Sequence, residues 1–253
     1  MLHKRVIPVL LLKDGSLVKT IKFNKHRYIG DPCNTVKIFN ELNADELIIL
    51  DISKSKQGAR PDFQLISSLA KECFMPMTYG GGIYNYEDAN RLFRSGVEKL
   101  SINSSNFFDE NLIYNLACRF GSQALVAAID IKKDFFGKAR VWNHANQTYT
   151  KDEPILYAKS LQDSGAGELL ITSVSNEGTW TGPELEIAKS IASKVSVPCI
   201  INGGVGHEEH IYEALDSEVS AVGVSSFFLF QKKDFGVLVN IPDSIRLREA
   251  LYS

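Results

Sequence analysis

The stretch ADELIILDIS, residues 44–53, recurs as AGELLITSVS, residues 166–175, an offset of 122 positions between the two alanines. Each copy has a charged start, a short apolar run and a polar end, as is typical of a buried strand in a parallel sheet. The same offset carries Gly81-Gly82 onto Gly203-Gly204 and Ser104 onto Ser226. Three separate elements thus share one offset close to half the chain, which indicates an internal duplication.

Short apolar runs and helix-like segments alternate outward from these two copies. The runs are RVIPVLLL, ELIILDI, FMPMTY, EKLSIN, ALVAAIDI, ELLITSV, VPCII and SAVGV. Such alternation predicts parallel β–α units. Two four-strand halves, about 1–122 and 123–253, are each too small to close alone, so we expect a single α/β domain, a (βα)8 barrel. A doubly wound open sheet is the alternative, but it does not predict the halved repeat.

Charge and composition limit the class of protein. The 28 Lys and Arg residues against 30 Asp and Glu leave a net charge of −2, which gives no broad basic surface for nucleic acid or membrane. The first apolar run stops at Lys13 without a cleavage pattern, so we expect no signal peptide, no membrane insertion and a cytoplasmic location. The four widely spaced cysteines favour reduced thiols over a disulfide framework.

Two glycine pairs follow corresponding strands. TYGGGI (78–83) ends the third apolar run and INGGVG (201–206) ends the seventh, where a barrel has its active site. Glycines there let backbone N–H groups approach an anion, and the following helix directs its positive end toward it. We expect two phosphate sites and a ligand with a phosphate at each end. Their residues are Gly81, Gly82, Asn103 and Ser104 in one half, and Gly203, Gly204, Ser225 and Ser226 in the other. Tight turns alone are the alternative for either pair.

Two further polar segments carry less weight. His207 and His210 have a spacing that can hold a metal on one helix face, but the other strand ends supply no further histidine. We therefore expect no metal and no cofactor. The segment WNHANQTY after the fifth strand suggests a small hairpin over the barrel end, with Trp142 and Tyr149 as packing groups.

The chain resembles the cyclase subunit of imidazole glycerol phosphate synthase, the HisF family, over nearly its whole length. The segments that carry this resemblance are KRVIP, LKDGSLVK, GDP, ADELIILDI, YGGGI, EDANRLFRSGVEKLSINSS, RFGSQALVAAIDIK, GAGELLITS, EGT, INGGVG, EHIYEA and SSFFLF. The resemblance implies a (βα)8 barrel that receives ammonia from a HisH-like glutaminase docked on its bottom face.

The resemblance also implies two catalytic aspartates at the ends of strands one and five. Asp130 matches the acid, whereas the position of the base is Leu11. A positioned acid or base contributes about a hundred- to ten-thousandfold in rate, and leucine cannot transfer a proton. Asp14 and Asp51 are the nearest substitutes in sequence, but we expect Asp14 in a mobile loop after strand one.

Other family positions are partly kept. The family's DRDGT segment is SNEGT here, so Ser175 replaces one carboxylate, whereas Glu177 retains the other. Lys19 matches a loop lysine of the family that could reach a substrate phosphate. Four strand-start residues match the family's ammonia gate: Arg5, Glu46, Lys99 and Glu168. Two more match its glutaminase-docking surface: Glu98 and Gln123.

The sequence keeps the gate residues and the phosphate-binding loops of the HisF family but lacks the catalytic base at Leu11. This combination favours a HisF-like paralogue. We expect it to support amidination of a sugar, the acetamidino modification of surface polysaccharides, with a HisH-like glutaminase, a sugar amidotransferase and a phosphorylated small molecule as partners. The alternatives are an authentic cyclase of histidine biosynthesis with a rearranged base, and a noncatalytic scaffold that activates the glutaminase.

Overall fold

The barrel wall is a closed ring of parallel strands in the computed structural model, which describes residues 4–54, 59–233 and 235–242. Each wall strand pairs with the next, and the ring closes because β12 pairs with β1 and β10 with β7. Within the described residues, the wall strands are β1 (Arg5–Lys13), β4 (Leu47–Asp51), β5 (Met77–Gly80), β6 (Lys99–Ile102), β7 (Leu125–Lys133), β10 (Glu168–Ser173), β11 (Cys199–Asn202) and β12 (Ala221–Val224). Closure confirms the (βα)8 barrel and excludes the open sheet.

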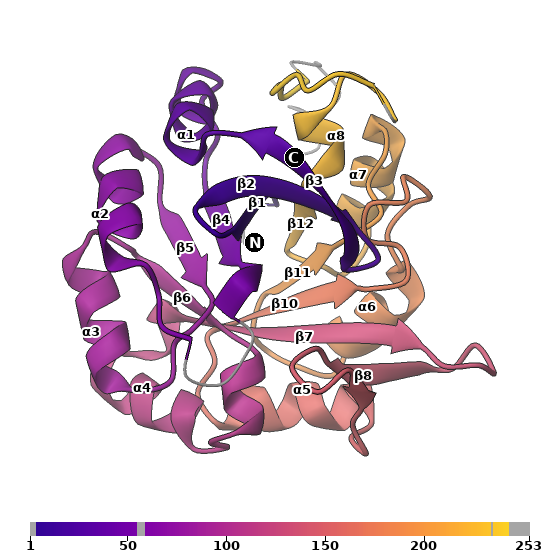
Figure 1. Cartoon of the computed structure of the whole chain (residues 1–253). Coiled ribbons are helices and arrows are strands. Elements are labelled where there is room, and N and C mark those ends of the chain that lie inside the picture. Colours follow the sequence, from indigo (N-terminus) through magenta and orange to yellow (C-terminus); the bar gives the residue numbers. More distant parts are fainter. Residues whose placement is uncertain (1–3, 55–58, 234, 243–253) are drawn as a thin grey trace.

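Helices cover the outside of the wall (Figure 1). Local capping explains where several begin: Asp31 accepts a hydrogen bond from the Asn34 N–H at 2.8 Å, and a proline follows it at the first helical position. Within the described residues the helices are α1 (Pro32–Glu41), α2 (Phe63–Glu72), α3 (Tyr86–Arg94), α4 (Leu112–Phe120), α5 (Pro154–Asp163), α6 (Leu185–Ala192), α7 (Glu208–Leu215) and α8 (Ser226–Leu229). Short 3-10 turns occupy Ile52–Lys54, Ser104–Phe107 and Ser122–Ala124. None of these helices has the length and apolar character needed to cross a membrane.

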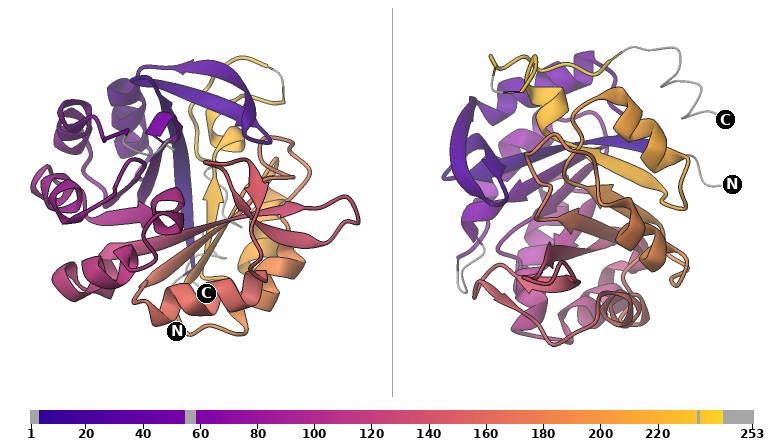
Figure 2. Two further views of the ribbon diagram at one scale, coloured as in Figure 1. Left: turned by 60° about the horizontal axis from the view of Figure 1, so that its bottom comes forward. Right: turned by 90° about the vertical axis from the view of Figure 1, so that its right-hand side faces the viewer.

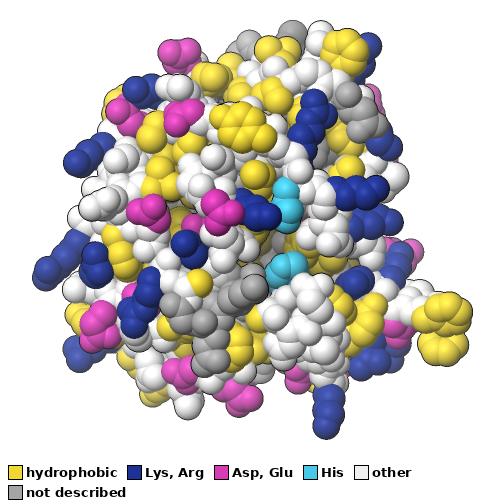
Figure 3. Space-filling view, in the orientation of Figure 1, with side chains coloured by type: hydrophobic (Ala, Val, Ile, Leu, Met, Phe, Trp, Pro, Cys, Tyr) yellow, Lys and Arg dark blue, Asp and Glu magenta, His cyan; other side chains and the backbone are white. Residues whose placement is uncertain are grey.

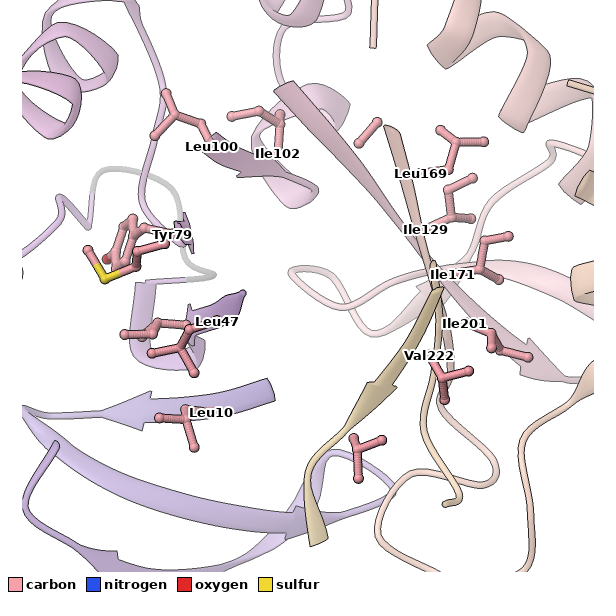
Figure 4. Packing of buried hydrophobic residues seen from close by; sticks show 14 of the residues in the cluster. Leu10, Leu47, Tyr79, Leu100, Ile102, Ile129, Leu169, Ile171, Ile201 and Val222 are labelled. Atoms are coloured by element: carbon pink, nitrogen blue, oxygen red, sulfur yellow. The ribbon is translucent and has the colours of Figure 1, made fainter. Parts of the chain in front are cut away.

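The wall strands bury both of their faces. Side chains on the outer face pack beneath the helices, and the labelled residues in Figure 4 come from all the wall strands. A second, smaller cluster fills the barrel interior: Ile7, Val9, Ile48, Val126, Ala128, Leu170, Ile200 and Ala221. Two buried faces explain why the strands are nearly continuous apolar runs rather than alternating ones.

Two pairs of antiparallel strands extend the wall beyond the ends of β1 and β7. The first comprises β2 (Ser16–Ile21) and β3 (Asn24–Gly30), and it lies across one end of the barrel (Figures 1 and 2). β1 pairs directly with β2, so Asp14 lies in a tight turn between strands, with a φ of 49°. The second comprises β8 (Ala139–Asn143) and β9 (Thr148–Tyr149), which form the hairpin expected in WNHANQTY. β8 also pairs antiparallel with the end of β7, and the two strands form the β7–β8 hairpin.

Candidate functional site

A cavity of about 480 Å³ opens at the end of the barrel where the strands finish, and this end is called the mouth below. Figure 3 shows a hollow in this face, bordered by histidine side chains and by charged side chains. A cavity of this size suits a small-molecule ligand, and in a (βα)8 barrel the active site lies at this end.

Both glycine pairs line the mouth cavity, and both need to be glycine. Gly81 and Gly82 have φ values of 122° and 72°, and an added Cβ would lie 2.5 Å from the carbonyl oxygens of Asp51 and Ala59. A residue with a Cβ would clash at either position and would be strained at these φ values, so both positions require glycine.

The second pair repeats this geometry. Gly203 and Gly204 have φ values of 94° and 106°, and a Cβ on Gly204 would lie 2.1 Å from the Gly182 carbonyl oxygen. Next to this pair, the buried Ser225 hydroxyl makes no hydrogen bond within the described chain, so it can serve a ligand. The two pairs thus form matching, backbone-lined turns in one cavity.

Leu11 and Asp130 lie on opposite sides of the mouth, because four steps around the ring separate β1 from β7. Both line the cavity. Leu11 shares the inward face of β1 with Arg5, Ile7 and Val9, as the two-residue period of a strand requires. An isobutyl group therefore faces the mouth where the family resemblance implies a carboxylate.

Asp130 is buried, and its surroundings favour the protonated carboxyl. Burial raises the pKa of Asp130 to about 7, although a hydrogen bond from the Asn103 amide to Asp130 Oδ2, at 2.9 Å, opposes the rise. Such a group can take up or release a proton near neutral pH. The Asn103 side chain, expected at a phosphate, lines the cavity and contacts the candidate acid.

Lys19 is not free to meet a ligand in this structure. Its side chain is buried and its ammonium forms an ion pair with the carboxylate of Glu177, which also accepts a hydrogen bond from the Phe23 N–H at 3.0 Å. The Lys22 N–H donates to the Glu177 carbonyl oxygen at 2.9 Å. Glu177 therefore fastens the β2–β3 hairpin to the loop after β10.

The candidate substitutes for the missing base also line the cavity. Asp51 accepts hydrogen bonds from the N–H and hydroxyl of Ser53, at 3.0 and 2.6 Å, while burial raises its pKa. Asp14 lines the cavity from the β1–β2 turn. Ser175, at the position of the second lost carboxylate, accepts a hydrogen bond from the Lys133 N–H at 3.3 Å.

Sequence reasoning missed two histidines at the mouth. His26 comes from β3 and His144 from the loop of the β8–β9 hairpin, and both line the cavity. Burial lowers the pKa of His144, and the nearby His26 and Lys132 lower it further. The His144 ring meets the Phe23 ring edge-on, with centroids 5.3 Å apart. No short motif contains both histidines, so their common place at the mouth becomes evident only from the positions of the two hairpins.

The expected gate residues meet at the opposite end of the barrel, and they form a charge ring of Arg5, Glu46, Lys99 and Glu168. Arg5 donates to Glu46 at 2.7 Å and also pairs with Glu168. Lys99 lies 3.1 Å from Glu168 and 3.6 Å from Glu46. Opposite charges thus alternate around the ring, with the apolar interior cluster between it and the mouth.

The two expected docking residues lie near the charge ring. Glu98 precedes Lys99 and accepts a hydrogen bond from the Met77 N–H at 2.7 Å. Gln123 donates to the Phe120 carbonyl oxygen at 3.1 Å. Both are exposed and available to a partner surface.

His207 and His210 contact each other, with ring centroids 3.5 Å apart, and His207 contacts Glu209. Among the described residues, three or more histidine, cysteine, aspartate or glutamate side chains nowhere come together as a metal site would require.

The fold and the mouth define a (βα)8-barrel protein with twin glycine turns at one end and a charge ring at the other. A family model described as "Histidine biosynthesis protein" matches residues 5–234. The chain belongs to this family, and within it to the HisF-like subunits of the imidazole glycerol phosphate synthase family.

Relatives match along almost the entire chain. The protein provisionally named imidazole glycerol phosphate synthase subunit hisF2 in Pseudomonas aeruginosa is 42% identical over 98% of this chain and 99% of its own. A provisionally named subunit hisF3 of Vibrio vulnificus is 40% identical over 99% and 97%. Imidazole glycerol phosphate synthase subunit HisF of Exiguobacterium sibiricum is 41% identical over 90% and 91%.

Proposed function

We propose that this chain is the synthase-type subunit of a glutamine amidotransferase complex, and that it handles ammonia for amidination of a sugar rather than for imidazole closure. The observation that carries the proposal is Leu11, which faces Asp130 across a mouth that keeps both glycine turns. Without a proton-transfer group at Leu11, the two-carboxylate chemistry implied by the family lacks its base.

The charge ring supports an ammonia entrance. A HisH-like glutaminase docked beside Glu98 and Gln123 would release ammonia at the ring, and neutral ammonia would cross the apolar interior cluster to the mouth. The contact from Lys99 to Glu46, at 3.6 Å, is the longest in the ring. Because it is also the weakest, Lys99 is the side chain that we expect to swing aside for passage.

The mouth supports a phosphorylated ligand. The twin glycine turns and the unpartnered Ser225 hydroxyl offer hydrogen-bond donors at two places in one cavity. Lys19 would join the ligand only if its pair with Glu177 opened. A sugar amidotransferase that accepts the ammonia is the third component of the proposed complex.

A second candidate is an authentic cyclase of histidine biosynthesis with a rearranged base. The observation in its favour is Asp130, whose buried carboxyl has a pKa of about 7, with Asp51 and His144 lining the same cavity. The deciding experiment uses the substrate that the HisF resemblance implies, a bisphosphorylated aminoimidazole carboxamide ribonucleotide, and measures its ammonia-dependent turnover by the isolated chain and by Leu11→Asp. The proposal expects an inactive native chain and a gain of activity in the variant. Turnover by the native chain at ordinary cyclase rates would make it a cyclase.

Replacement of Lys99 separates an ammonia conduit from a glutaminase-activating scaffold. In a conduit, Lys99→Ala uncouples glutamine hydrolysis from product formation because the ring no longer controls passage. The matched control is Lys71→Ala, an exposed lysine at the end of α2. If Lys99→Ala leaves hydrolysis and its coupling unchanged, the gate assignment is wrong.

A further inference from the structure

The turn of the β7–β8 hairpin carries two aromatic side chains that are almost fully exposed in the described structure. Phe135 is 97% exposed and Phe136 is 90% exposed, the highest values among the large hydrophobic residues of the described chain. The two rings contact each other edge-on, with centroids 5.6 Å apart. This pair is called the aromatic tip. The β7–β8 hairpin protrudes from the right-hand side of the barrel in Figure 1, and Figure 3, in the same orientation, shows exposed hydrophobic side chains at that edge. Contiguous exposed apolar surface of this kind marks an interaction site.

The turn that carries the aromatic tip is well fixed. Asp134 Oδ1 accepts hydrogen bonds from the N–H groups of Phe136 and Lys138, at 2.9 and 3.0 Å. The Asp134 N–H donates to the Lys138 carbonyl oxygen at 2.9 Å, and Gly137 supplies the positive φ of 79° that closes the turn. The rings are therefore held outward by local structure, which lowers the entropic cost of docking them.

The segment that carries the aromatic tip has an excess of positive charge. The segment KKDFFGKAR, residues 132–140, holds four cationic side chains and one carboxylate, and Asp134 uses its carboxylate within the turn. Lys138 forms no ion pair with any described residue, whereas Lys133 pairs with Glu184. The net charge of −2, from which we expected no membrane partner, averages over the whole chain and hides this local excess.

We propose that the aromatic tip and its cations dock on an anionic lipid surface. Apolar rings partition into the boundary between headgroups and acyl chains, and neighbouring lysine and arginine side chains are attracted to anionic lipids. The tip is a convex protrusion, so a fluid bilayer accepts it without the matched socket that a folded partner would need. The hairpin leaves the barrel at the mouth end, so docking leaves the charge ring at the other end uncovered. The inference does not depend on the proposed function.

Sedimentation with vesicles tests the proposal. The full chain is mixed with vesicles of phosphatidylcholine alone or of phosphatidylcholine with phosphatidylglycerol. We expect co-sedimentation with the anionic vesicles that weakens as salt rises. Phe135→Ser/Phe136→Ser should weaken binding at least tenfold, and Lys138→Glu should weaken it and reduce its salt dependence. Both changes are at exposed positions, so thermal unfolding should stay unchanged. The matched control is Phe74→Ser, an exposed phenylalanine outside the hairpin, 85% exposed, which should bind as the native chain does.

Three results would overturn the proposal. The first is a native chain that stays in the supernatant with anionic vesicles at low salt. The second is equal binding by the native chain and the double serine variant. The third is a native chain that does not bind vesicles but self-associates through the tip, so that the double variant becomes monomeric in analytical ultracentrifugation. That third result would make the tip a contact between copies of this chain.

Discussion

Asp130 and Leu11 are buried to a similar extent, but burial has opposite energetic effects on the two side chains. Leu11 is 8% exposed and Asp130 is 6% exposed, so neither is freely hydrated. For leucine this burial is favourable, whereas an ionised carboxylate loses solvation that a single amide hydrogen bond from Asn103 does not replace. The raised pKa of Asp130 is the result.

The raised pKa predicts a pH dependence of stability. Between pH 4 and pH 7 the folded chain keeps the Asp130 proton while the unfolded chain loses it, so the free energy of unfolding falls as pH rises. Asp130→Asn removes this term. At about 1.4 kcal/mol per pKa unit, the variant should gain roughly 4 kcal/mol relative to the native chain between pH 4 and pH 8. Urea unfolding at both pH values measures the gain.

The control for this experiment is Asp45→Asn, an exposed aspartate outside the mouth. It should leave the pH dependence as it is in the native chain. A native chain and an Asp130→Asn variant with parallel stability curves across this pH range would show that Asp130 is ionised throughout.

The β2–β3 hairpin is held across the mouth by contacts that are distant in sequence. Glu177 pairs with Lys19 and accepts from the Phe23 N–H, and Gly178 lies so close that a Cβ would be 2.2 Å from the Thr20 carbonyl oxygen. Most of β3 is exposed, so it contributes little apolar burial of its own. The hairpin therefore depends on this attachment.

Loss of the Glu177 charge should release the hairpin. Glu177→Gln leaves the Lys19 ammonium buried without a counter-charge, which typically costs about 3 kcal/mol or more. Because the barrel core is unchanged, we expect local opening, with more than about a hundredfold faster hydrogen exchange in Ser16–Gly30. Exchange measured by mass spectrometry locates the change, and trypsin should cut faster at the lysines of the hairpin. Glu72→Gln, which breaks the exposed Lys37–Glu72 pair, is the control. Equal exchange in both variants would contradict the attachment.

The whole barrel has two seams if it is divided at the sequence repeat. One seam is the β6–β7 pairing and the other is the β12–β1 pairing. The charge ring crosses this division, because Glu168 comes from the second half and its partners Arg5 and Lys99 from the first. Each half alone would leave two parallel strand edges unpaired, which promotes association.

Separate production of residues 1–122 and 123–253 tests the two halves as structural units. Each fragment alone should self-associate, whereas co-expressed fragments should form a one-to-one complex that unfolds cooperatively. Size-exclusion chromatography and circular dichroism report both properties. A chain divided at Gly165 is the comparison, since this split separates β10 from β7, its neighbour in the wall. If the fragments split after residue 122 and those split at Gly165 gave the same yield of folded complex, the repeat would not mark a structural boundary.

The apolar runs and the repeat determined the fold class, because the alternation of strands and helices leaves few ways to bury both faces of eight short strands. The same patterns placed Asp130, Leu11 and the glycine pairs at strand ends, and strand ends of a barrel meet at one mouth. Tertiary structure alone decided the contacts among side chains. The ion pair of Lys19 with Glu177, the hydrogen bond from Asn103 to Asp130 and the placement of His26 and His144 at one cavity each involve residues from separate elements. Their distances depend on how far each hairpin folds over the mouth, which no local pattern in the sequence specifies.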